Sequence, residues 1–396
     1  MTRVDEALEH VRLACGTPRA RVEHVPLAAA LGRVLAADVR MDHPVPPFRR
    51  AAMDGFALGA PAGEAWRVVG RVAAGEASTR ALAAGEAMRV MTGAPVPEGT
   101  RVVLPFEQAL EQGEGVRAPQ GLPRATHVVE AGEHVGAGEV VLRAGERLQA
   151  GAVGVLAAAG VARVPVAVRP RVAVLATGDE LVEVAATPGA AQIRNSNNPA
   201  LQAAVLLHGG EAWGLGVAGD REPDLAQALG SGLEADLLLV SGGVSKGDLD
   251  LVPSVLARLG VSTRFHGWRV QPGGPLWFGQ RGDTLVFGLP GNPAASFVGM
   301  ELLVAPALAT RLGRPFAARR AWPVAWAGPD VGPYARVRLR PVTLEPGAAG
   351  LEARPVAWKG SGDPFALARA EALAVLPEPG IARGALVEAV PLAVPA

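Results

Sequence analysis

Leu237-Leu-Leu-Val-Ser-Gly-Gly-Val-Ser-Lys-Gly-Asp-Leu-Asp250 is the stretch that decides the fold of this 396-residue chain. Four large apolar residues in a row predict a strand buried on both faces, and Ser241-Gly-Gly243 predicts a tight turn where that strand ends. Strands buried on both faces occur mainly in parallel sheets covered by helices. The stretch therefore predicts an α/β domain with a polar loop after one central strand.

The surrounding sequence repeats this pattern from about 166 to 316. Short apolar runs alternate with longer helix-like stretches, as expected for a doubly wound sheet. The predicted strands are 172–176, 215–217, 237–240 and 285–287, and the predicted helices are 200–207, 223–230, 251–259 and 297–312.

The rest of the chain has a different texture. Before the α/β region, the pattern predicts an amphipathic helix near the amino end, a strand at 22–27, a short helix at 28–35 and a further helix beginning near Gln149. Short apolar pieces between turn residues from 48 to 124 predict a small β domain. The alternation in Ala335-Arg-Val-Arg-Leu-Arg340 predicts a carboxy-terminal β barrel or sandwich.

Composition narrows the class of protein. The formal net charge is zero, which argues against nucleic acid or an anionic membrane as the main partner. Hydrophobic residues make up 49% of the chain, so a sizeable core can be buried and disorder is not expected. The single cysteine, Cys15, excludes an internal disulfide and a multi-cysteine metal site. Charged residues near the amino end replace the apolar stretch of a signal peptide. We therefore expect a cytoplasmic protein.

Polar residues follow each predicted strand. Ligands bind beyond the carboxyl ends of such strands, so these residues should gather at one edge. Ser241-Gly-Gly243 suits a phosphate, because glycines let backbone N–H groups converge on an anion, and Lys246 adds a positive charge. The alternative is a plain strand-to-helix turn.

Four carboxylates, Glu180, Asp220, Asp248 and Asp250, fall at the same predicted edge. Clustered carboxylates repel one another unless a cation lies between them, and Mg²⁺ held by one or two carboxylates would suit. Each acid alone could instead cap a helix or turn. Asp248 and Asp250 would point in opposite directions on an extended backbone, so we expect only one to face the site.

Scarce residues mark further loops. The only four asparagines stand at 192–199 and 288–293, in a chain that otherwise avoids this residue, which makes both loops candidate ligand sites. Two loops outside the α/β region offer Asp54 before a glycine and Thr92 in a proline-rich loop. Taken singly, each of these two loops is typical of a turn.

Six motifs stand in one order over nearly the whole chain. They are Pro47-Phe-Arg-Arg-Ala-Ala-Met-Asp-Gly-Phe-Ala57, Met91-Thr-Gly-Ala-Pro-Val-Pro97, Thr177-Gly-Asp-Glu-Leu181, Ser241-Gly-Gly-Val-Ser-Lys-Gly-Asp248, Gly288-Leu-Pro-Gly-Asn-Pro293 and Gly360-Ser-Gly362. Together they resemble the MoeA family of molybdopterin molybdenumtransferases, which is related to the carboxy-terminal part of gephyrin.

The resemblance implies that the protein inserts molybdate into adenylylated molybdopterin in a Mg²⁺-dependent step that releases AMP. It also implies a homodimer of elongated chains. The parts would be a linker domain at 1–45 and 125–165, a small β domain at 46–124, a molybdopterin-binding α/β domain at 166–316 and a C-terminal β barrel at 317–396.

The alternatives are a molybdopterin-binding scaffold and a molybdopterin adenylyltransferase. The adenylyltransferase could also be a partner of this protein, and tungstate could replace molybdate.

Carried over by motif, the implied catalytic residues are Asp54 and Thr92 from the small domain and Glu180, Asp220 and Asp250 from the α/β domain. They would meet across the dimer interface, and Glu180 and Asp250 would hold Mg²⁺. The implied molybdopterin-binding residues are Ser241, Gly242, Gly243, Ser245, Lys246, Pro290, Asn292 and Pro293.

Three positions depart from the family pattern. His134 stands where the family often has an aspartate, which removes a carboxylate. Gly274 stands near a common lysine position, which removes a cation. Asn195 replaces an acid that is often seen in its loop.

Overall fold

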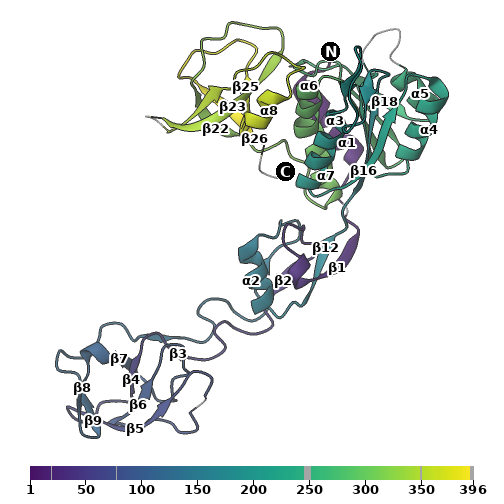
Figure 1. Cartoon of the computed structure of the whole chain (residues 1–396). Coiled ribbons are helices and arrows are strands. Elements are labelled where there is room, and N and C mark those ends of the chain that lie inside the picture. The colour runs from purple at the N-terminus through teal and green to yellow at the C-terminus, as the bar shows by residue number, and fades with distance from the viewer. Residues whose placement is uncertain (19, 77, 245–250, 348–349, 393–396) are drawn as a thin grey trace.

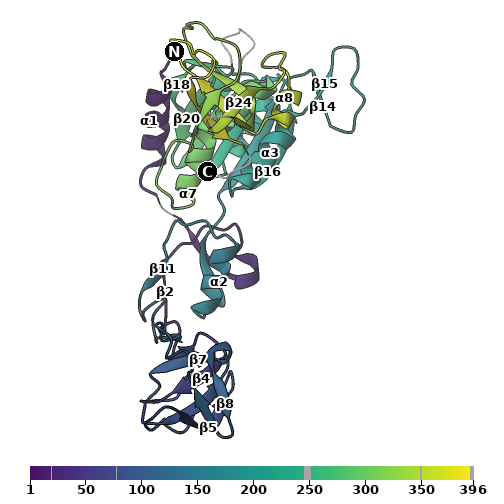
Figure 2. The same cartoon turned by 90° about the vertical axis from the view of Figure 1, so that its left-hand side faces the viewer.

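The computed structural model describes residues 1–18, 20–76, 78–244, 251–347 and 350–392. The chain is elongated (Figures 1 and 2). The α/β domain and the C-terminal barrel lie together at one end, the small β domain lies at the other, and the linker domain joins them.

The α/β domain is built on a six-stranded sheet with the order β16-β13-β17-β21-β20-β18. The first four strands are parallel, which confirms the predicted parallel core, whereas β20 runs antiparallel to both of its neighbours, β21 and β18. The sequence does not predict β18 and β20. The strands are β13 (Arg171–Thr177), β16 (Glu211–Ala218), β17 (Leu237–Ser241), β18 (Ser262–His266), β20 (Trp277–Arg281) and β21 (Thr284–Leu289).

Helices cover both faces of this sheet. Successive residues of β13 explain why: Val172 and Val174 face one apolar core, while Ala173 and Leu175 face a second. The first core is covered by α1 (Val4–Cys15), α3, α6 and α7, and the second by α4 and α5 (Figure 1). Those helices are α3 (Asn197–Leu207), α4 (Glu222–Gly232), α5 (Val252–Arg258), α6 (Pro293–Gly299) and α7 (Ala305–Arg311).

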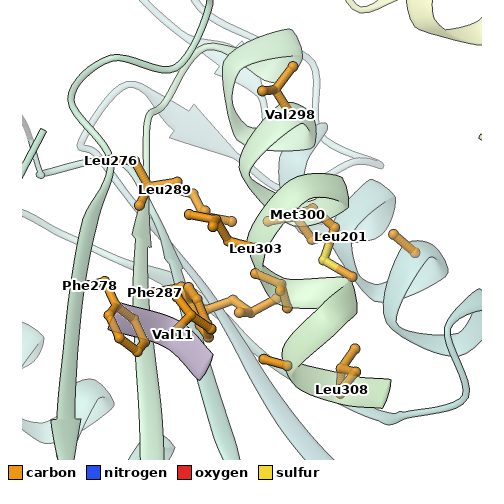
Figure 3. Close-up of a cluster of buried hydrophobic side chains, with 14 of the residues drawn as sticks. Val11, Leu201, Leu276, Phe278, Phe287, Leu289, Val298, Met300, Leu303 and Leu308 are labelled. Carbon is orange, nitrogen blue, oxygen red and sulfur yellow. The ribbon is translucent and has the colours of Figure 1, made fainter. Parts of the chain in front are cut away.

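The helix at the amino end, α1 (Val4–Cys15), packs on the α/β domain against α7 and β18, although its residues were predicted to belong to the linker domain. Its buried residues Ala7, Val11 and Cys15 are spaced by four, so they form one stripe along the helix. That stripe joins the first core beside Phe278 and Phe287 (Figure 3). The sequence pattern predicts the stripe but not the surface that buries it.

The longest helical segment, Pro293–Arg311, runs through α6, a π-helical turn at Met300–Val304 and α7. It is long and apolar enough to cross a membrane, but 83% of its apolar window is buried inside the protein. Figure 3 shows Val298, Met300, Leu303 and Leu308 on this segment, and all four belong to the first apolar core. The segment is therefore a core helix of the α/β domain.

The linker domain contains two short two-stranded sheets, each of which pairs segments that lie far apart in the sequence. β1 (Val22–Pro26) pairs with β12 (Arg163–Ala167), and the predicted strand at 22–27 is thereby confirmed. The predicted helix at 28–35 is only a 3₁₀ turn at Leu27–Ala29. The remaining elements are β2 (Val39–Arg40), β11 (Val140–Leu142) and α2 (Ala150–Ala158).

The small β domain has a six-stranded sheet with the order β7-β4-β6-β5-β9-β8. The loop between β3 (Arg50–Ala51) and β4 (Gly55–Leu58) carries Asp54, and the loop after β6 (Glu86–Val90) carries Thr92. The other elements are β5 (Trp66–Val72), β7 (Val102–Pro105), a 3₁₀ turn (Phe106–Gln108), β8 (Leu110–Gln112), β9 (Gly115–Arg117) and β10 (Val128–Val129), which pairs with β3.

The C-terminal domain is a closed barrel, because β23 pairs with β25 in addition to the order β23-β24-β22-β26-β25. Leu339, Leu373 and Val390 of the barrel join the first core of the α/β domain, so the two domains share one apolar interior. The strands are β22 (Trp322–Trp326), β23 (Val337–Gly347), β24 (Gly350–Pro355), β25 (Ala372–Leu376) and β26 (Leu386–Pro391), with α8 (Phe365–Arg369) between β24 and β25, and β19 (Val270–Gln271) adding to β23.

Candidate functional site

A hollow of about 850 Å³ lies at the carboxyl ends of the parallel strands, as predicted. Eight of the predicted site residues line it: Glu180, Asp220, Ser241, Gly242, Gly243, Pro290, Asn292 and Pro293. We call this space the carboxylate hollow. Its wall also includes β15 (Ile193–Arg194) beside β14 (Leu181–Val182), and Phe365 from α8 of the barrel domain.

The turn after β17 requires glycine at two positions. Gly242 and Gly243 have φ of +100° and +62°, in the region that side chains disfavour. A Cβ on Gly242 would lie 2.5 Å from the carbonyl oxygen of Thr177, and one on Gly243 would lie 2.8 Å from Val252 Cγ2. The turn is therefore pressed against the end of β13.

Only part of this turn can hold an anion. The N–H of Gly242 donates to the carbonyl oxygen of Leu289 at 3.0 Å, so among the described residues of this turn the N–H groups of Gly243 and Val244 are the ones that could contact an anion. His266 Nε2 lies 2.8 Å from the carbonyl oxygen of Val244 and supports the turn from β18. The hydroxyl oxygen of Ser241 accepts a hydrogen bond, which leaves its own hydrogen for a ligand.

Two carboxylates come to the hollow from neighbouring loops. The Glu180 side chain lies over Gly178, where a Cβ would approach Oε2 to 2.4 Å. The Asp179 carboxylate accepts from the N–H of Asp220 at 3.0 Å and so ties the loop after β13 to the loop after β16. Glu180 and Asp220 therefore line one space, as their positions after adjacent strands predict.

The asparagines hold loops together. Asn197 Nδ2 donates to Ser241 Oγ at 2.7 Å and to the carbonyl oxygen of Gly291 at 2.6 Å. Asn195 Oδ1 accepts from the N–H of Asn198, whose own Nδ2 donates to the carbonyl oxygen of Gly216. The structure thus explains these scarce residues by the geometry of the rim, and their side-chain amides are engaged within the protein.

Asn292 joins two domains. Its Nδ2 donates to Ser361 Oγ at 2.9 Å, and the N–H of Ala294 donates to the carbonyl oxygen of Ser361 at 3.0 Å. The Gly360-Ser-Gly362 motif is therefore fixed to the start of α6. This contact lies where the carboxylate hollow borders a second cavity.

The second cavity, of about 790 Å³, lies between the barrel and the α/β domain. Arg336, Arg338 and Arg340 line it, with no carboxylate among the described residues of its wall. Arg338 stacks on Tyr334 at 4.9 Å and Arg340 on Trp358 at 5.0 Å. Burial and then the neighbouring Arg338 lower the pKa of Arg340. We call this space the arginine cavity.

These arginines were missed as site residues. The alternation in 335–340 predicts a strand, and its period of two also places every second side chain, here each arginine, on one face. Gly274 lines the same cavity, and a Cβ on it would lie 3.1 Å from Arg336 Nη1. Arg336 therefore puts a cation beside the position where the lysine is absent.

Asp54 and Thr92 form a pair in the small domain. The Asp54 carboxylate accepts from the Thr92 N–H at 2.7 Å and from its hydroxyl at 2.8 Å. These bonds, the backbone one first, lower the pKa of Asp54. The pair lies at the opposite end of the chain from the carboxylate hollow (Figure 1), so one chain does not bring the two together.

The remaining predicted residues, Ser245, Lys246, Asp248 and Asp250, lie outside the described residues. His134 Nε2 lies 3.4 Å from Arg50 Nη2, on the side of the small domain.

Two family models match the chain. The MoeA N-terminal region (domain I and II) matches residues 2–160, and a probable molybdopterin binding domain matches 173–310. A molybdopterin molybdenumtransferase of Bacillus subtilis (strain 168) is 35% identical over 323 residues, which cover 78% of this chain and 74% of that protein. Its counterpart from Staphylococcus epidermidis is 30% identical over 369 residues, covering 89% and 87%.

Solved structures of MoeA proteins resemble this chain over almost its whole length. The molybdopterin biosynthesis moeA protein from Pyrococcus horikoshii OT3 has a TM-score of 0.84 and 29% identity, over 98% of this chain and 99% of that one. The predicted multidomain α/β-plus-β fold is confirmed. From its matched regions and its relatives, the chain belongs to the MoeA family of molybdopterin molybdenumtransferases, enzymes of molybdenum cofactor biosynthesis.

Proposed function

We propose that this protein inserts molybdate into adenylylated molybdopterin in the cytoplasm, with hydrolysis of the phosphoanhydride bond and release of AMP. The observation that carries the proposal is the pair of adjoining cavities of opposite character. The carboxylate hollow and the arginine cavity share Pro275, Pro290 and Asn292 in their walls. A substrate that carries both phosphates and an oxyanion-accepting group suits such a pair.

The carboxylate hollow suits the phosphates together with Mg²⁺. Mg²⁺ usually takes one or two carboxylates plus phosphate oxygens, which Glu180, Asp220 and the substrate would provide. Asp250, predicted with Glu180 to hold Mg²⁺, lies outside the described residues. The described residues contain no group of three or more His, Cys, Asp or Glu that could hold a metal alone, so the phosphates would complete the site. Mg²⁺ bound there would offset the charge of the leaving AMP.

The protein's own groups would position the phosphoanhydride. The Ser241 hydroxyl and the N–H groups of Gly243 and Val244 can donate to phosphate oxygens. The buried hydroxyl of Thr177, beneath this turn, has no hydrogen-bond partner in the described part of the chain, and an orphaned buried hydroxyl favours a polar ligand nearby.

The arginine cavity suits molybdate. Bare carboxylates repel an oxyanion, whereas Arg336, Arg338 and Arg340 supply cations on one strand face. Arg338 Nε is buried without a partner among the described residues, which leaves a donor for an anion. Molybdate and tungstate share this tetrahedral chemistry, so the cavity accommodates either.

A homodimer would complete the site. Asp54 and Thr92 are remote from the hollow within one chain, and large apolar side chains beside them are exposed: Met53 by 41%, Met91 by 45% and Phe48 by 43%. Exposed apolar groups around a polar pair favour a contact surface. We propose that a second copy places this pair at the hollow of its partner.

Mixing two inactive variants tests the shared site. Asp54→Ala and Glu180→Gln should each fold but release no AMP. If the site is shared, a mixed dimer contains one intact site, so an equal mixture should regain about a quarter of wild-type activity. No recovery in a mixture shown to exchange subunits would refute the shared site.

The transfer itself is tested by incubating the protein with adenylylated molybdopterin, Mg²⁺ and molybdate and following AMP. AMP release that requires both Mg²⁺ and molybdate supports the proposal. Consumption of ATP with free molybdopterin would instead indicate an adenylyltransferase, and binding without AMP release a scaffold. Asp250→Ala is predicted to abolish release, although Asp250 lies outside the described residues.

A further inference from the structure

The rim of the carboxylate hollow carries two large apolar side chains that face solvent. Ile193 of β15 is 58% exposed and Phe365 of α8 is 70% exposed, and both line the hollow. Phe365 is the only aromatic residue among the described residues of this wall. Among these described residues, Phe365 of the barrel domain is therefore the aromatic side chain on which a planar ring in the hollow could stack.

The backbone that presents Phe365 is fixed. The Asp363 carboxylate accepts from the N–H of Phe365 at 3.0 Å and from the N–H of Lys359 at 3.1 Å. Ser361, two residues before Asp363, is held to the start of α6 by hydrogen bonds from Ala294 and Asn292. The ring is thus exposed on a rigid support, and an aromatic face held in place loses little entropy when a ligand stacks on it.

We propose that Phe365 stacks on a planar fused heterocycle of a ligand whose phosphates lie at the Ser241–Gly243 turn. This inference rests on the proposed function, because the adenylylated substrate carries two such rings, a pterin and an adenine, joined through phosphates. Ile193 supplies apolar surface on the same rim. Phe365 would then be a binding residue that couples the barrel domain to substrate recognition.

Three variants of the full chain test this role. Phe365→Leu keeps an apolar side chain but removes the π face, and Phe365→Trp keeps a π face. Leu386→Ala is the control, because Leu386 is 72% exposed on β26 and lines neither cavity. AMP, a pterin phosphate and inorganic pyrophosphate are titrated into each variant by calorimetry.

We expect Phe365→Leu to weaken one of the two ring-bearing probes by roughly 5- to 150-fold, the usual loss when a base loses an aromatic partner. Phe365→Trp should restore that affinity. Pyrophosphate binding should stay at the wild-type value in every variant. The probe that loses affinity identifies which ring meets Phe365.

Several results would overturn the stacking role. They are equal affinity of wild type and Phe365→Leu for both ring-bearing probes, no binding of either probe to the wild type, and a loss of pyrophosphate affinity in Phe365→Leu. These experiments also distinguish failure of the proposed molybdate insertion from failure of the stacking role. Phe365-dependent binding without AMP release refutes the transfer alone, whereas normal AMP release with an unchanged KM in Phe365→Leu refutes the stacking alone.

Discussion

Replacing Gly242 with alanine tests whether the turn after β17 makes the proposed contact with phosphate. The new side chain meets two obstacles: a φ of +100° and a carbonyl oxygen of Thr177 only 2.5 Å from the added Cβ. Thr177 ends a central strand and is buried, so its carbonyl cannot retreat. The turn itself must move by about 0.9 Å to bring that distance from 2.5 Å to an ordinary 3.4 Å.

A shift of this size is large for a hydrogen bond. The N–H of Gly243 would leave the range of roughly 2.7 to 3.2 Å that such bonds occupy. A hydrogen bond to a charged group contributes about 1.5–3 kcal/mol, so pyrophosphate should bind the Gly242→Ala variant roughly 10- to 150-fold more weakly. Isothermal titration calorimetry measures this directly.

The matched control is Gly121→Ala. Gly121 has a φ of +82° with nothing within 4 Å of an added Cβ, and it lies in the small domain. It carries the conformational cost of about 1–2 kcal/mol without the collision. Wild-type pyrophosphate affinity in Gly242→Ala, or an equal loss in Gly121→Ala, would refute the reasoning.

Three further predictions concern single groups. Thr92→Val removes one donor to Asp54, so the pKa of Asp54 should rise towards its ordinary value in a carboxyl NMR titration; no rise would contradict the pairing. Because that pKa is lowered on folding, the stability it confers is present above the unfolded pKa and is lost as pH falls through the folded one. Glu301→Ala removes the carboxylate from the buried pairs with His208 and Arg319 and should lower the free energy of unfolding by roughly 3–5 kcal/mol in urea denaturation; a change below about 1 kcal/mol would contradict this. Burial raises the pKa of Cys15 to about 11. Iodoacetamide should therefore alkylate the unfolded chain much faster than the native one at about pH 8. Equal rates of alkylation would contradict the burial of this thiol.

Much of the α/β domain was predictable, because local pattern and long-range structure agree there. The apolar run 237–240 is buried on both faces, as its lack of alternation indicates. Residues that follow parallel strands gather at one edge for topological reasons, so Glu180, Asp220 and Ser241 meet as predicted. The strands β18 and β20 lack a continuous apolar run, so the pattern that predicts the core strands does not find them.

The arginine cavity was not predictable as a site. Arg336, Arg338 and Arg340 form one face of a strand by their spacing, but only the closed barrel turns that face towards the α/β domain. Phe365 is similar, since its exposure depends on how α8 docks beside Asn292 and Ser361. Pairing between distant segments decides both features, and a local pattern does not contain it.

The shared interior of the barrel and the α/β domain has a consequence for ligand selection. Leu339, Leu373 and Val390 are buried with the sheet, so the barrel cannot slide without exposing apolar surface to water. The arginines therefore stand at a fixed distance from the carboxylates, so the proposed two-cavity site should select a ligand by the distance between its charged groups. A compound with the right charges but the wrong distance between them would bind in only one of the two cavities.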